Sequence, residues 1–133
     1  ISSKKIDTPD FAPHAVKAGP YLFLSGRQAN DLNNISSSIK SHSSSPFVTL
    51  KGKEEMKKIL ADIDTICQEA GGSINDLVKM QIFATELNDM PGAIESMKEV
   101  FSNEAPAVNI IGVTGPHVIP SLSLATNLIA YIP

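Results

Sequence analysis

The spacing of apolar side chains predicts two amphipathic helices in the middle of the chain. Across residues 52–70, apolar residues recur every three or four positions, and most charged residues lie off that stripe. Residues 71–72 are both glycine and can supply the left-handed turn that commonly ends a helix. A second apolar stripe over residues 94–101 predicts another helix, capped by Asn88 or Asp89.

Apolar and alternating runs predict the strands. Residues 15–18 and 21–25 are separated by a Gly-Pro turn signal and are expected to form a hairpin. Near the end of the chain, two apolar runs flank a Gly/Pro-rich connector, as two strands joined by a loop do. The expected strands are residues 4–6, 15–18, 21–25, 76–85, 107–113 and 122–132.

The element order, β-β-β-α-β-α-β-β, indicates an α+β fold with both helices on one face of a mixed sheet. The last run, residues 122–132, is apolar at nearly every position, which implies burial on both of its faces. A two-layer monomer covers only one face of a sheet. We therefore expect an oligomer in which a second subunit covers the other face.

Composition limits the classes of protein that remain. The 133 residues suffice for a single domain, residues 1–133, and the composition of 42% hydrophobic and 19% charged residues is that of a globular protein. A net charge of −3 without a basic cluster disfavours nucleic acid. No apolar run approaches the about 20 residues that span a membrane. The only cysteine, Cys67, lies on the apolar helix stripe, which favours core packing and a reducing, cytoplasmic compartment.

Between the hairpin and the first helix, residues 27–51 show no period and include a serine-rich stretch at 36–45. A loop of this length in a small domain is commonly functional or disordered, and we expect it to be mobile and exposed. A zinc site is not expected, because the three histidines lie far apart in sequence and no close Cys/His spacing occurs.

Three stretches in order resemble a known family. They are A-V-K-A-G followed by L-F-L-S-G near the start, E-A-G-G-S with D-L-V-K and L-N-D-M in the middle, and A-P-A at residues 105–107. Over about residues 12–132 the chain resembles the Rid/YjgF family of reactive-intermediate deaminases, also called L-PSP endoribonucleases.

The resemblance implies a chorismate-mutase-like homotrimer, with the sheets forming an inner barrel and ligand clefts between neighbouring subunits. It also implies hydrolysis of imines or enamines, such as 2-aminoacrylate, to a ketoacid and ammonia, with no metal or organic cofactor. In the family, an arginine after Pro-Ala holds the substrate carboxylate, a glutamate on the last strand places water, and an early tyrosine lines the cleft. The corresponding residues here are Val108, Asn127 and His14, which indicates a divergent member.

Three residues are candidates for catalysis. His14 could line the cleft and exchange protons, Arg27 could replace the missing anion anchor, and Asn127 could orient water. Each also has a structural interpretation: an exposed loop histidine, a solvated arginine and an interface amide. The expected substrate-binding residues, by family position or by their place in the enlarged connector, are Ser25, Gly26, Phe83, Val108, Ile110 and His117.

Three functions follow as hypotheses. The leading one is a small-metabolite-binding homotrimer that hydrolyses an imine, an enamine or a related compound. The alternative is a homotrimer that binds a small molecule or regulates without catalysis. The family's older label of ribonuclease or translation inhibitor is disfavoured, because the chain is acidic and has no basic stripe with interleaved aromatic residues.

Overall fold

The computed structural model describes residues 1–3, 12–29, 50–102 and 104–133. The expected strand at residues 4–6 and most of the expected loop at residues 27–51 lie outside the described residues. The elements are β1 (Ala15–Ala18), β2 (Tyr21–Arg27), α2 (Leu50–Glu69), β3 (Leu77–Ala84), α3 (Met90–Val100), β4 (Ala107–Gly112) and β5 (Leu124–Tyr131), with short 3-10 turns at Ile74–Asp76 and Leu87–Asp89.

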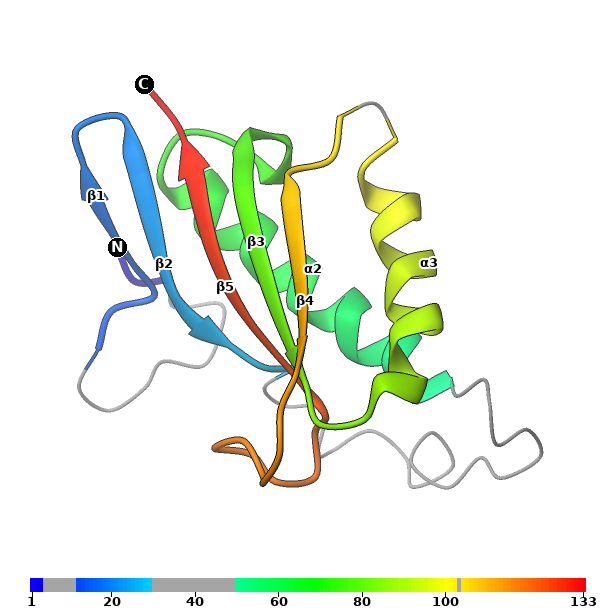
Figure 1. Ribbon diagram of the computed structural model, residues 1–133. Helices are drawn as coiled ribbons and strands as arrows, with labels where there is room; N and C mark the ends of the chain where they lie inside the picture. Colours follow the sequence, from blue (N-terminus) through cyan, green and yellow to red (C-terminus); the bar gives the residue numbers. More distant parts are fainter. Residues whose placement is uncertain (4–11, 30–49, 103) are drawn as a thin grey trace.

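The strands form one mixed sheet in the order β1-β2-β5-β3-β4. Neighbouring strands are antiparallel except β3 and β4, which are parallel. In Figure 1, α2 lies behind this sheet, and α3 lies beside α2, to the right of β4. The α+β class and the mixed sheet with two helices on one face are therefore confirmed. None of the described helices is long and apolar enough to cross a membrane.

The core lies between α2 and the sheet. Met56, Ile59 and Ile63 on α2 are fully buried, as are Leu22 and Met80 on the facing strands. Cys67 is buried in the same layer, and burial raises the pKa of its thiol to about 12. A thiol with so high a pKa is not ionised at neutral pH, so Cys67 acts as a core side chain.

The two helices approach each other closely at Gly52. A Cβ atom at this position would lie 1.9 Å from the carbonyl oxygen of Asp89, just before α3. Ser96 on α3 donates a hydrogen bond to the Lys53 carbonyl at 2.7 Å. The absence of a side chain at residue 52 therefore allows α3 to pack where it does.

The last strand is covered on only one face within the chain. Leu124, Thr126, Leu128 and Ala130 are buried toward the helices, whereas Asn127 and the other residues between them are exposed or half-buried. The apolar sequence of β5 suggested burial on both faces, but a single chain buries only one of them.

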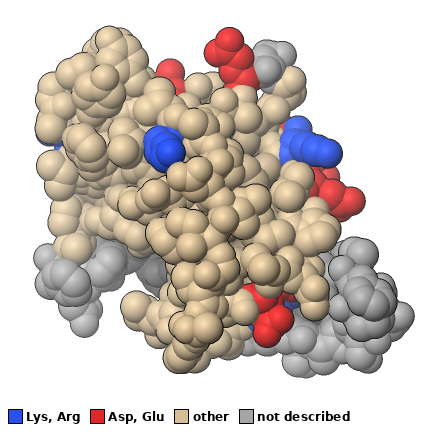
Figure 2. All heavy atoms as spheres, in the orientation of Figure 1, with Lys and Arg blue, Asp and Glu red and all other residues tan. Residues whose placement is uncertain are grey.

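The uncovered side of the sheet is here called the open face. By strand register it carries Val16, Tyr21, Phe23, Lys79, Gln81, Phe83, Asn109, Ile111, Ala125, Asn127, Ile129 and Tyr131. Several of its large apolar residues are about half exposed, among them Phe23 at 47% and Tyr21 at 45%. Figure 2 looks onto this face, and acidic side chains appear toward the top, right and lower parts of the view but not in its middle. It is an extensive, mostly apolar surface.

Candidate functional site

Three amide side chains cross the middle of the open face in one row. Gln81 on β3 is in register with Asn109 on β4 and with Asn127 on β5. The amide nitrogen of Asn127 donates to the Gln81 side-chain oxygen at 3.3 Å. Asn127, expected as a water-orienting residue, therefore lies on the exposed surface of the sheet within a polar row.

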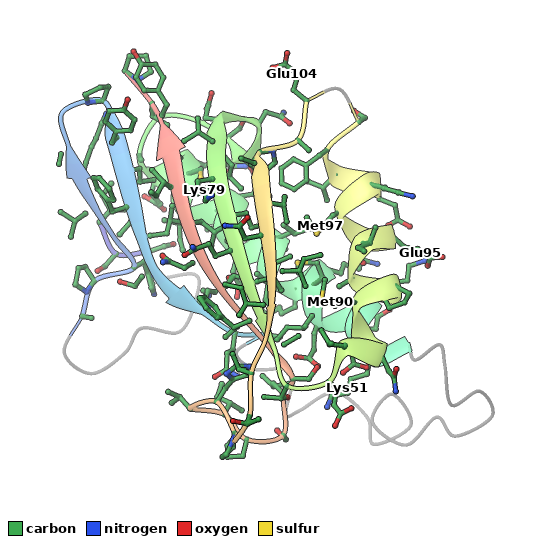
Figure 3. All side chains as sticks on the ribbon, in the orientation of Figure 1. Lys51, Lys79, Met90, Glu95, Met97 and Glu104 are labelled. Atoms are coloured by element: carbon green, nitrogen blue, oxygen red, sulfur yellow. The ribbon has the colours of Figure 1, made fainter. Side chains whose placement is uncertain are left out.

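Lys79 adds a positive charge beside this row. The Asn109 amide has one orientation in which its oxygen and its nitrogen both form hydrogen bonds. In that orientation the Asn109 oxygen accepts from Lys79 Nζ at 3.2 Å, and the Asn109 nitrogen donates to the Val108 carbonyl at 3.3 Å. Lys79 is half-buried and lies in front of the sheet in Figure 3. We call Lys79, Gln81, Asn109 and Asn127 the polar row.

A β-bulge directs Lys79 to this face. Leu77 pairs with Ala130 but Lys79 pairs with Ile129, so β3 has one extra residue, Val78, against β5. Strict alternation from the buried Leu77 would have turned residue 79 toward the helices. The extra residue reverses that direction, as bulges do.

Arg27 is held on the opposite side of the sheet. Its Nη2 atom donates to the Asp62 carboxylate of α2 at 2.8 Å, and the two side chains are only 5% and 4% exposed. Asp62 also accepts from Lys58 at 2.9 Å. The expectation that Arg27 replaces the missing anion anchor is therefore not met in this chain, because its charge is already neutralised by a buried acid.

His14 is also enclosed. It is 1% exposed, and its Nδ1 atom accepts a hydrogen bond from the Ser3 backbone N–H at 2.9 Å. Because the His14 Nδ1 atom accepts a hydrogen bond, it carries no proton. The proton of the neutral imidazole is therefore on Nε2. Within the chain, His14 is a buried side chain beneath the N-terminal residues and does not line an exposed cleft.

The remaining expected binding residues lie in three places. Ser25 is half-buried and its hydroxyl donates to the Pro13 carbonyl at 2.6 Å, and Gly26 beside it is exposed. Phe83 is half-buried on the open face, two positions from Gln81. The Nε2 atom of His117 lies 3.1 Å from the carbonyls of both Phe83 and Ser123, so this nitrogen donates and fixes the connector to the sheet.

Val108 and Ile110 do not share a face with Asn127. They are in register with Met80 and Ile82, both fully buried on the helix side. Val108 is half-buried and packs against the core, whereas Ile110 is 45% exposed at the edge of the sheet. Any apolar wall that these two residues form is therefore at the β4 edge and not on the open face.

The chain thus unites only part of the expected site. Asn127 and Phe83 lie on the open face, but His14 and Arg27 are buried elsewhere. Sequence reasoning missed Lys79, Gln81 and Asn109. The alternation of residues 79, 81 and 83 with the buried residues between them was a signal that Lys79 and Gln81 share a face with Phe83, but the pairing that adds Asn109 to them could not be predicted from the sequence.

A second polar cluster is fully buried and joins three elements. The Glu55 carboxylate accepts from the backbone N–H groups of Ser123 at 3.0 Å and Leu124 at 3.1 Å, and the Ser123 hydroxyl lies between the carboxylates of Glu55 and Asp89. Burial raises the pKa of Glu55 above its usual value, opposed by these backbone hydrogen bonds and by Lys51. The cluster fixes the start of β5 to α2.

Among the residues that the structure describes, no group of three or more His, Cys, Asp or Glu side chains could hold a metal ion. The chemistry available on the open face is hydrogen bonding from the amides and charge from Lys79. Both can bind and orient a small polar molecule, and neither Asn nor Gln can accept a proton from water near neutral pH.

Comparison with known proteins places the chain in a family. A family model described as Endoribonuclease L-PSP matches residues 8–118. The chain is 30% identical over 93 residues to a RutC family protein of Pyrococcus abyssi, a match that covers 70% of this chain and 65% of that protein.

Two further relatives match over most of their length. A 2-iminobutanoate/2-iminopropanoate deaminase of Dermatophagoides farinae is 27% identical over 120 residues, which is 85% of this chain and 86% of that protein. The crystal structure of yeast Mmf1 superposes with a TM-score of 0.79 at 18% identity, covering 99% of this chain and 97% of that one. From the family match and these relatives, the chain belongs to the Rid/YjgF family, whose sequence model bears the description endoribonuclease L-PSP.

Proposed function

We propose that this protein is a homotrimer that binds a small metabolite between its subunits and hydrolyses an imine or enamine. The observation that carries the proposal is the open face, an apolar sheet surface that includes Asn127 in its polar row. Monomeric proteins rarely expose contiguous apolar patches of this kind. A second copy of the same chain would cover the aromatic residues that are left about half exposed.

The reaction class is supported by the relative named as an iminobutanoate and iminopropanoate deaminase. In such a hydrolysis, water adds to the imine carbon and the carbon–nitrogen bond then breaks. The products are a ketone or ketoacid, whose carbonyl oxygen comes from the water, and ammonia, whose nitrogen has taken up both protons of that water. Asn127 would orient the water through its amide oxygen, while the basic imine nitrogen takes up the proton.

The test combines mass and turnover. Light scattering during gel filtration should give the mass of three chains, and imines generated in solution should release ammonia faster with the protein than without it. The Asn127→Ala variant should keep the trimer mass and lose most of the acceleration. A monomeric protein, or an acceleration unchanged by this substitution, would contradict the proposal.

Binding without catalysis is the second candidate. It is favoured by the amide at Asn127, which cannot act as a base, and by the buried pairing of Arg27 with Asp62. In that case, small metabolites should raise the melting temperature of the trimer while ammonia release stays at the uncatalysed rate. Among the described residues of the open face, Lys79 is the sole cation. An RNA substrate is therefore not favoured, because single-stranded nucleic acid is bound along a positively charged groove.

A further inference from the structure

We propose that the polar row is an anion site in which Lys79 binds the carboxylate of a small ligand, in place of the arginine that the sequence lacks. The inference rests on the proposed assembly through the open face, and it adds a specific ligand class and a specific cation. Lys79 and Asn109 supply the charged and neutral donors, and Gln81 and Asn127 continue the row across the sheet.

Charge on the open face is unbalanced. Its described residues include one cation, Lys79, and no carboxylate. No acidic group appears in the middle of the view in Figure 2. Once a second subunit covers this face, an unpaired ammonium would be removed from water at a large energetic cost, so an anion must accompany it. A small carboxylate is the simplest group that fits among side chains that are otherwise amides and hydrocarbon.

The backbone supports a specific placement of this cation. Because of the bulge at Val78, Lys79 lies on the open face, whereas alternation continued from the buried Leu77 would have placed it on the helix side. The Asn109 amide oxygen then holds the ammonium at 3.2 Å, which directs it toward the row. The side-chain oxygen of Gln81 accepts from Asn127, and its amide nitrogen has no hydrogen-bond acceptor among the described residues. An ammonium and an amide N–H can together donate to the two oxygens of a carboxylate.

The experiment measures binding of 2-oxobutanoate, the ketoacid that hydrolysis of 2-iminobutanoate yields, by calorimetry on the assembled protein. Lys79→Gln should weaken its affinity by about tenfold or more, as expected for loss of a charge-assisted hydrogen bond. The matched control is Lys57→Gln, an exposed lysine on α2, which should bind as the wild type does. Butanone, which lacks the carboxylate, should not distinguish Lys79→Gln from the wild type.

The outcomes separate this inference from the proposed function. Equal affinity of the wild type and Lys79→Gln for 2-oxobutanoate overturns the anion site, even if imine hydrolysis is observed. Lysine-dependent binding without turnover supports the site and contradicts only the catalytic proposal. If Lys79→Gln lowers the assembly mass and leaves binding intact, an acid of a neighbouring copy pairs with Lys79, and the ligand site is wrong.

Discussion

Glu55 is a fully buried acid whose ionisation is coupled to folding. Burial raises its folded-state pKa above 4.5, so the folded protein binds this proton more tightly than the unfolded chain does. The stabilisation from protonated Glu55 is complete below the unfolded pKa. It is lost as pH rises through the higher folded value.

The substitution Glu55→Gln tests this coupling, because glutamine keeps an acceptor oxygen for Ser123 and Leu124 and does not titrate. The unfolding free energy of the variant minus that of the wild type should rise as pH increases from the unfolded-state pKa of glutamate, about 4.3, through the higher folded-state pKa. Urea denaturation at several pH values measures it, with the half-exposed neighbour Glu54→Gln as control. A difference that does not vary with pH would show that Glu55 has the same protonation in both states.

Arg27 is a structural ion-pair residue according to its contacts. Arg27→Met leaves the Asp62 carboxylate buried with Lys58 as its cationic partner among the described residues, and breaking a buried pair commonly costs about 3 kcal/mol of folding free energy. We expect a loss of that order in urea denaturation, with Lys17→Met on exposed β1 near zero. If Arg27→Met left the stability unchanged but abolished ligand binding, Arg27 would instead be an anion anchor.

At the scale of elements, the packing of α3 on α2 depends on Gly52. Alanine is the better helix former by about 1 kcal/mol, yet its Cβ would lie 1.9 Å from the Asp89 carbonyl oxygen. Gly52→Ala should therefore lower the unfolding free energy by about 1–3 kcal/mol, because the helices must move apart. Thermal and urea unfolding should show the loss, whereas Lys57→Ala on the exposed side of the same helix should be neutral. A stabilised Gly52→Ala protein would mean that the two helices are free to separate there.

Periodicity and apolar runs were enough to predict the helices and the described strands to within a few residues, although β4 has no fully buried residue. The expected helix at residues 52–70 is observed as Leu50–Glu69, and the expected strand at 76–85 as Leu77–Ala84. The hairpin of residues 15–18 with 21–25 was predicted and is observed, whereas the neighbours of β3, β4 and β5 were beyond the sequence, and with them the direction of individual side chains. Arg27 illustrates the reason: Leu24 pairs with Leu128 but Arg27 with Thr126, so a bulge in β2 turns Arg27 to the helix side. Alternation alone would have placed it on the open face with Phe23.

For the molecule as a whole, the open face decides the assembly. Phe23→Glu places a charge among aromatic residues that include Tyr21, whose ring centroid is 6.4 Å from that of Phe23. If a second subunit covers this face, the variant should dissociate to single chains in light scattering at micromolar concentration. Ile94→Glu on the exposed side of α3 is the matched control and should leave the mass unchanged. Dissociation by Ile94→Glu but not by Phe23→Glu would assign the interface to the helices.

The two bulges have a consequence for how such a protein could change over generations. Each consists of one additional residue, in β2 beyond Leu24 and in β3 at Val78, and each decides through which side of the sheet a basic side chain emerges. Deleting or inserting a single codon at either place would reverse the direction of every side chain on one side of the change, the basic residue among them, because side chains alternate along a strand. A single-residue indel in these strands would therefore alter which side chains reach a ligand without replacing any residue that touches it.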